Sequence, residues 1–165
     1  MKLSSGPQPV FTYLRDSAAR VDVEVGDARI LLERELANGE VQKFDVLVLD
    51  AFSGDAIPVH LLTREAFDTY WQHLKPDGII AVHVSSRHIN LFPVLQGLTA
   101  YFHADSVIDL NTAEDPFMTS CWVLLALHPG ALNIRGLKQT PNPYGTNISP
   151  RLWTDDYSDI FRLIR

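Results

Sequence analysis

Short apolar runs alternate with amphipathic segments along the chain. Valine and acidic residues alternate over Arg20–Val25, which predicts a half-exposed strand that ends at Gly26-Asp27. Phe44–Leu49 is apolar almost throughout, which predicts a strand buried on both faces by flanking helices, and Ile79–Val84 predicts another buried strand. Two further strands are predicted over residues 106–110 and 120–127. Only about ten residues join them, too few for a crossover helix, so we expect these two strands to be antiparallel neighbours.

Helical patterns lie between and after the predicted strands. Ala28–Ala37 is rich in Leu, Arg and Glu and is followed by Asn38-Gly39, which predicts a helix that stops there. The clearest helix should begin after Thr63 as N-cap, and Pro93 suits the first turn of another helix that runs to about Phe102. Thr154-Asp155-Asp156 predicts the cap of a last helix. Strands that alternate with helices indicate an α/β fold with a mainly parallel sheet. An antiparallel final hairpin is characteristic of the nucleoside-binding, Rossmann-like class I methyltransferase fold.

Composition narrows the class of protein. The chain has 165 residues, of which 46% are hydrophobic and 21% charged, as expected of one globular domain. Its net charge of −6, with Lys and Arg scattered singly, disfavours nucleic acid and anionic membranes as partners. Cys121 is the single cysteine, so no internal disulfide can form, and we expect Cys121 to lie in the core. No apolar run is long enough to cross a bilayer, and residues 1–10 lack the apolar core of a signal peptide, so a cytoplasmic location is expected.

Polar residues stand at three predicted strand ends. They are Asp27, Asp50, and His83 with the following Ser85 and Ser86. Ligands of open parallel sheets bind beyond the carboxyl ends of the strands. Two carboxylates there could hold a nucleoside and orient or deprotonate an amine. Alternatively, both aspartates simply cap the turns that follow them, and the pattern leaves both interpretations open.

Other chemistry is less well supported by the spacing. His83 and His88 could supply metal ligands near Asp50, but no helical His pair or Cys partner accompanies them, so we expect no metal site. Ser85-Ser86 lacks the Gly-x-Ser-x-Gly pattern of a nucleophile elbow. The three tryptophans are predicted to be core aromatics rather than a stacking platform; they are Trp71, Trp122 and Trp153.

Several segments, in order, resemble one family. Residues 44–58, FDVLVLDAFSGDAIP, resemble the fourth strand and gate loop of the spermidine synthase (polyamine aminopropyltransferase) family, and residues 60–67 and 74–79 continue the likeness. Upstream, residues 23–29, VEVGDAR, are similar to the third strand of that family. The tail WTDDYS, residues 153–158, is similar to the ending of bacterial spermidine-synthase-like proteins. The resemblance runs from Phe11 to the end of the chain.

The resemblance implies roles for individual residues. Asp27 would accept a hydrogen bond from the adenine amino group, and Ala28 would lend its backbone. Asp50 matches the catalytic aspartate, which orients and helps to deprotonate the amine that attacks decarboxylated S-adenosylmethionine. Asp50 and Ala51 would also border the nucleoside. Asp55 corresponds to the second acidic residue of the gate loop.

The chain departs from the family in two places. Four residues, 51–54, separate the two aspartates, where the family typically has a shorter segment, so a different loop closure and amine preference are expected. The glycine-rich turn and the acidic residue that hold the donor in the family should lie upstream of Phe11, where only residues 1–10 stand. We therefore expect residues 1–10 to be disordered or irregular. Residues 11–165 should form a truncated spermidine-synthase-like domain that lacks the first two strands.

A truncated sheet has consequences for assembly and function. The strand over residues 20–25 would have to pair with residues 44–49, pair with another chain, or remain an edge, so a homodimer through this exposed first strand is predicted. No permanently bound cofactor is expected. A nucleoside and an amine are the expected small-molecule partners, with decarboxylated S-adenosylmethionine or S-adenosylmethionine as co-substrate. Two functions stay open: an aminopropyltransferase that is incomplete in this chain, or a catalytically silent domain that acts as a nucleoside-binding or oligomerisation module.

Overall fold

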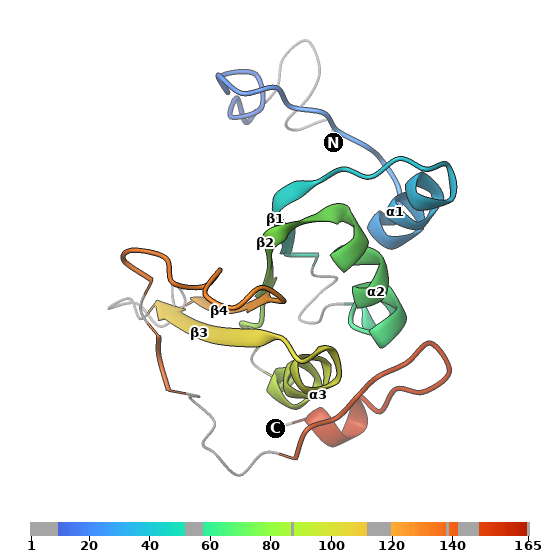
Figure 1. Ribbon diagram of the computed structural model, residues 1–165, viewed down its shortest axis with the longest axis vertical. Coiled ribbons are helices and arrows are strands. Elements are labelled where there is room, and N and C mark those ends of the chain that lie inside the picture. The colour runs from blue at the N-terminus through green and yellow to red at the C-terminus, as the bar shows by residue number, and fades with distance from the viewer. Residues whose placement is uncertain are drawn as a thin grey trace.

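The computed structural model contains an α/β domain built on one sheet (Figure 1). It describes residues 10–51, 58–86, 88–111, 120–137, 139–141 and 149–164. The strands are β1 (Phe44–Leu49), β2 (Leu74–His83), β3 (Asp105–Asn111) and β4 (Ser120–Ala126). The helices are α1 (Ala28–Ala37), α2 (Arg64–His73) and α3 (Phe92–Phe102), with short 3-10 turns η1 (Val59–Leu61) and η3 (Phe161–Leu163). The helices gather on one side of the sheet (Figure 1).

The sheet has the order β1-β2-β4-β3. β1 and β2 are parallel, and β4 is antiparallel to both β2 and β3, so β1, β2 and β3 all run in one direction. The predicted α/β fold with an antiparallel final hairpin is thus confirmed, and its last strand inserts between β2 and β3. β2 begins at Leu74 rather than at Ile79. Residues 75–78 form an irregular insertion in β2, because the pairing jumps from Phe44↔Leu74 to Val46↔Ile79.

The three predicted α-helices after residues 27, 63 and 91 are present. α1 has the predicted bounds, and the Asp27 carboxylate caps it by accepting the Ile30 N–H at 3.1 Å. The Thr63 hydroxyl caps α2 in the same way, accepting the Ala66 N–H at 3.3 Å. α3 carries Pro93 in its first turn, where the missing N–H costs nothing.

The strand predicted over residues 20–25 is wrong. These residues have no regular secondary structure, and Val21, Val23 and Val25 are 41%, 47% and 76% exposed. A strand needs a partner for its backbone groups, and within the described residues no strand lies beside this segment. The alternating pattern is therefore compatible with a strand, but no described strand supplies the hydrogen bonds that a strand here would need.

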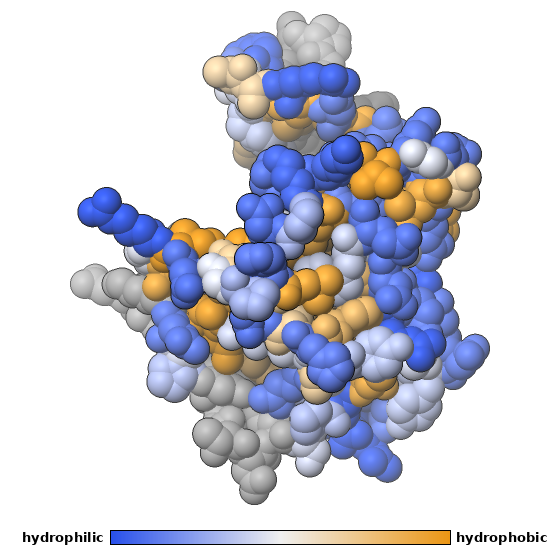
Figure 2. Space-filling model, viewed as in Figure 1, coloured by the Kyte–Doolittle hydropathy of each residue, from blue (hydrophilic) through white to orange (hydrophobic). Residues whose placement is uncertain are grey.

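β1 is consequently an edge strand of the sheet formed by the described residues, and β3 is the other. Its side chains alternate: Leu47 and Leu49 are 8% and 7% exposed, whereas Val46 and Val48 are 51% and 56% exposed. The prediction that this strand is buried on both faces is wrong, because the helices cover only the face that carries the two leucines. Apolar side chains also reach the surface in several places on the face of the molecule that Figure 2 shows.

The last predicted helix is also wrong. Thr154 and Tyr157 form an isolated antiparallel bridge, and helical backbone is limited to the 3-10 turn η3. The segment is fixed by tertiary contacts instead. Trp153 is 1% exposed in the core, and the Arg151 N–H donates to the Pro93 carbonyl at 2.8 Å. A Cβ at Gly97 would lie 2.1 Å from the Arg151 carbonyl oxygen, so the close approach of this segment to α3 requires glycine there.

The core lies between the inner face of the sheet and the helices. Its largest fully buried side chains include Phe67, Tyr70, Leu98 and Trp153, and Cys121 is buried as predicted. None of the helices in the described ranges is long and apolar enough to cross a membrane.

Candidate functional site

Three side chains from neighbouring strands form a row at the carboxyl end of β1 and β2. Leu49 pairs with Val82, so Asp50 stands opposite His83, and the His83 Nδ1 lies 2.8 Å from the Asp50 Oδ1. His83 in turn pairs with Trp122 of β4, and the two rings stack with centroids 4.6 Å apart at 20°. Residues directly opposite each other on adjacent strands project from the same face. We call these three residues the Asp50–His83–Trp122 row.

The row presents a carboxylate of defined orientation to solvent. The Asp50 side chain is 53% exposed and that of His83 is 21% exposed. An ionised carboxylate can only accept hydrogen bonds, so with Asp50 ionised the His83 Nδ1 carries the proton and donates. Among the described residues, this bond engages Oδ1 and leaves Oδ2 for another donor, such as an amine. Trp122, predicted as a core aromatic, is partly exposed and stacks on the imidazole.

Asp27 is held by two partners of its own. Besides capping α1 through Oδ1, it places Oδ2 2.7 Å from the His60 Nε2, and its side chain is 33% exposed. The hydrogen bond from the Ile30 N–H lowers the pKa of Asp27, and the His60 imidazole lowers it further. The capping interpretation therefore holds for Asp27, while the carboxylate stays partly accessible.

Asp27 and Asp50 belong to the same end of the sheet but do not share a contact. α1 begins beside the start of α2, because the Arg29 guanidinium donates to Thr63, and α2 begins after the carboxyl end of β1. Within the described residues, the hydrogen bonds of Asp27 go to Ile30 and His60, whereas that of Asp50 goes to His83. Asp27–His60 and Asp50–His83 are therefore separate aspartate–histidine pairs.

The remaining predicted site residues are placed as follows. Ala28 is the first residue of α1, and Ala51 directly follows Asp50 and is exposed. Asp55 lies outside the described residues. The Ser85 hydroxyl accepts the Cys121 N–H at 2.7 Å and that of Ser86 accepts the Ile89 N–H at 3.0 Å, so both serines serve the backbone. In the part of the chain that the structure describes, no three His, Cys, Asp or Glu residues gather as metal ligands would.

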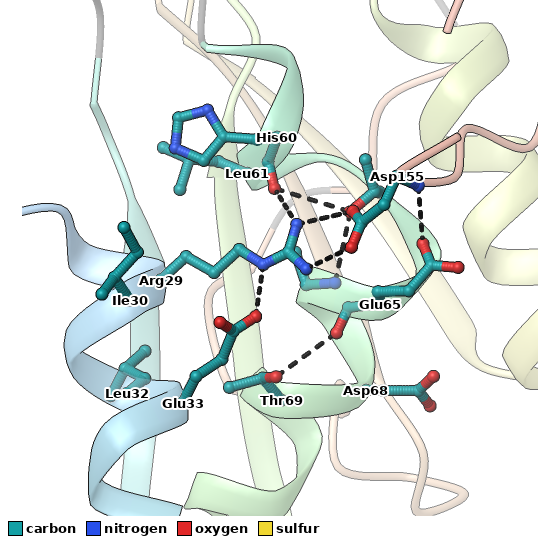
Figure 3. A network of polar contacts seen from close by, with 12 residues as sticks. Arg29, Ile30, Leu32, Glu33, His60, Leu61, Glu65, Asp68, Thr69 and Asp155 are labelled. Carbon is teal, nitrogen blue, oxygen red and sulfur yellow. Dashed lines mark hydrogen bonds and ion pairs between the residues drawn. The ribbon is translucent and has the colours of Figure 1, made fainter. Parts of the chain in front are cut away.

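Arg29 organises a network that the sequence analysis missed (Figure 3). Its Nε donates to Glu33 at 2.6 Å, and one Nη donates to the His60 carbonyl at 2.9 Å and to Thr63 at 3.1 Å. Both Nη atoms also contact the Asp155 carboxylate, at 2.7 and 2.6 Å. Asp155 raises the pKa of Arg29, and Arg29 in return lowers the pKa of Asp155. Asp155 therefore pairs with α1 instead of capping a helix of its own.

This network borders a shallow groove of about 430 Å³. Its lining residues come from α1, from the segment before α2 and from the C-terminal segment: Arg29, Val59, His60, Thr63, Thr154, Asp155 and Ser158. The Arg29 side chain is 11% exposed and its donors are engaged, so it connects these segments rather than offering a free cation. No local sequence signal could have identified the pair, because Arg29 and Asp155 are 126 residues apart.

Comparison with known proteins relates this chain to one enzyme class. No family model matches the chain. It is 41% identical over 64 residues to a polyamine aminopropyltransferase from Vibrio vulnificus (strain CMCP6), and this match covers 39% of the chain and 21% of the relative.

Two solved structures share the fold. The crystal structure of spermidine synthase from Thermotoga maritima aligns with a TM-score of 0.51 and 12% identity over 88% of the chain and 47% of that structure. A spermidine synthase in complex with the transition state analogue AdoDATO aligns with a TM-score of 0.50 and 12% identity, covering 89% of the chain and 46% of that structure. The chain thus spans less than half the length of these synthases. The chain is similar to these synthases in fold and, over 64 residues, to the polyamine aminopropyltransferase in sequence.

Proposed function

We propose that the Asp50 end of the sheet serves aminopropyl transfer from decarboxylated S-adenosylmethionine to an amine. The observation that carries this proposal is the Asp50 carboxylate, which follows β1, is oriented by His83 and is half exposed. The fold shared with spermidine synthases and the sequence similarity to a polyamine aminopropyltransferase support it.

The chemistry needs one well-placed carboxylate. The amine nitrogen attacks the methylene carbon next to the sulfonium, a C–N bond forms, and the C–S bond breaks with its electron pair going to sulfur. The products are the aminopropylated amine and methylthioadenosine. Asp50 would hold the amine by a charge-assisted hydrogen bond and accept the proton that the new ammonium loses.

Asp27 and Ala28 would contact the adenine, and Ala51 would border the nucleoside beside Asp50. The Asp27 carboxylate already accepts bonds from Ile30 and His60, but each carboxylate oxygen has two lone pairs. The adenine amino group would therefore share Oδ2 with His60 or displace it. Asp55 would supply the second acid of the gate loop. Because the chain spans less than half the length of the solved synthases, we expect residues beyond those described here to complete the donor pocket.

The test combines binding and turnover. Calorimetry with decarboxylated S-adenosylmethionine, S-adenosylmethionine and methylthioadenosine should show heat with at least one of them. Asp50→Asn should leave that binding nearly unchanged and lower turnover by about 100-fold or more, because an amide cannot accept the proton. The matched control is Asp45→Asn, an aspartate near the start of β1 that pairs with Lys75, at the opposite end of the strand from Asp50. No heat with any ligand, or unchanged turnover in Asp50→Asn, would refute the proposal.

A second candidate is a catalytically silent domain that binds a nucleoside or mediates oligomerisation. One observation favours it through oligomerisation: β1 has an open edge among the described residues. Nucleoside binding without turnover, in the presence of a range of amines, would favour this candidate over the enzyme.

A further inference from the structure

We infer that His83 is a positioning residue for Asp50, and that Trp122 fixes the plane of the His83 imidazole. This inference rests on the proposed function, since it assigns the group that aims the proton acceptor. It is carried by the Asp50–His83–Trp122 row. A hydrogen bond joins Asp50 to His83, and both strand pairing and ring stacking join His83 to Trp122.

The two ends of the Asp50–His83 bond differ in how they are held. Asp50 stands one residue past the end of β1, so strand pairing stops just before it. His83 is still part of β2, and its backbone pairs with Trp122 on β4, an inner strand of the sheet. The imidazole is therefore anchored on the rigid scaffold, and the hydrogen bond transmits that position to a side chain one residue beyond the strand.

Stacking adds a second restraint. With the rings 4.6 Å apart and 20° from parallel, Trp122 limits rotation of the imidazole out of its plane, and so sets the direction in which Nδ1 points. His83 is also less exposed than Asp50, at 21% against 53% of the side chain. A carboxylate held through one oxygen presents the other in a constant direction, which is what an attacking amine requires.

Two substitutions separate positioning from packing. His83→Phe keeps a ring on Trp122 but removes the N–H donor, whereas His83→Gln keeps an N–H donor without the ring. We expect His83→Phe to lower kcat by about 100-fold, as misplacement of a reacting group does, with little change in the KM for the nucleoside donor. His83→Gln should recover a large part of that loss. His128→Phe, at an exposed position outside the sheet, is the control for replacing a histidine ring.

A result with wild-type kcat in His83→Phe would overturn the inference, because His83 would then serve packing alone. Equal losses in the Phe and Gln variants would overturn it as well, since the hydrogen bond would not be the cause.

A measurement without turnover distinguishes failure of the inference from failure of the proposed function. In a double-mutant cycle of Asp50→Ala and His83→Phe, the shifts of the denaturant midpoint should be non-additive, because each change removes the same bond. Additive shifts would overturn the inference whatever the activity. If the shifts in the cycle are non-additive but the wild-type protein shows no turnover, the positioning of Asp50 is upheld and the proposed reaction is refuted.

Discussion

Arg29 and Asp155, which are 126 residues apart in the sequence, form a bidentate ion pair with N–O distances of 2.7 and 2.6 Å. The same guanidinium donates a hydrogen bond to the His60 carbonyl, and the His60 ring forms a hydrogen bond with the Asp27 carboxylate. A chain of polar contacts thus links the C-terminal segment to the start of α1 (Figure 3). It fixes the position of an aspartate that the family resemblance assigns to nucleoside binding.

Breaking this ion pair should destabilise the domain. Asp155→Asn removes a charged acceptor from a guanidinium that is only 11% exposed, so we expect the free energy of unfolding to fall by about 1.5–3 kcal/mol. Chemical denaturation monitored by far-UV circular dichroism measures it. Asp156→Asn changes an exposed aspartate in the same turn and should stay within about 0.5 kcal/mol of wild type. Equal midpoints for the two variants would show that the pair contributes nothing.

Acid should weaken the fold through the same carboxylates. The folded-state pKa values of Asp27 and Asp155 are lowered from the ordinary value of 3.8. A carboxylate with a lowered pKa stabilises the fold fully above its ordinary value, and that contribution is lost as pH falls through the folded-state pKa. Denaturant midpoints measured from about pH 6 to about pH 2 should therefore drop below about pH 4. The double variant Asp27→Asn/Asp155→Asn should lose less over this interval, and an identical acid loss would contradict the assignment.

Local signals in the sequence were enough for the three α-helices and for the antiparallel pairing of the last two strands. Asp27 and the Asn38-Gly39 pair mark both ends of α1, and Thr63 marks the start of α2, because caps are satisfied by residues a few positions away. The antiparallel final hairpin followed from the length of its connection. Asp50 and His83 were both recognised at strand ends, but only the register of β1 against β2 brings them within 2.8 Å.

The wrong predictions concern segments whose structure depends on contacts with residues far away in the sequence. Arg20–Val25 has the alternation of a strand, yet a strand exists only where another strand supplies its hydrogen bonds. Residues 160–164 have helical spacing, but Asp155, the expected cap, is taken by Arg29, and the segment is fixed by Trp153 in the core. The Arg29–Asp155 pair itself has no signature at short range.

Substitutions at Asp27 should separate its structural role from ligand binding. Asp27→Ala removes the α1 cap and should cost about 1 kcal/mol of unfolding free energy, while Asp27→Ser retains a capping oxygen and should cost little. Both remove the carboxylate that faces His60. If Asp27 binds the adenine amino group, both variants should lose affinity for methylthioadenosine in calorimetry. If only the Ala variant weakens binding, the effect comes from the helix cap and the binding role is wrong.

The edge of β1, beside which no other described strand lies, is a candidate interface for a second copy of the chain. The expected first strand over residues 20–25 is not formed, so we propose that any homodimer uses β1 instead. Two β1 strands paired antiparallel would continue the sheet from one copy into the next and bring the exposed Val46 and Val48 side chains together.

A charge on β1 should separate the two copies. Val48→Lys places a cation on the outer face of the edge strand, a device by which natural edge strands avoid pairing. Sedimentation velocity should show a concentration-dependent dimer for the wild-type chain and a monomer for Val48→Lys. Val25→Lys, at a valine that is 76% exposed and outside the sheet, should dimerise like wild type. A wild-type monomer at every concentration would exclude the interface, and dissociation by Val25→Lys instead would assign it to residues 20–25, because pairing there would have to form on association.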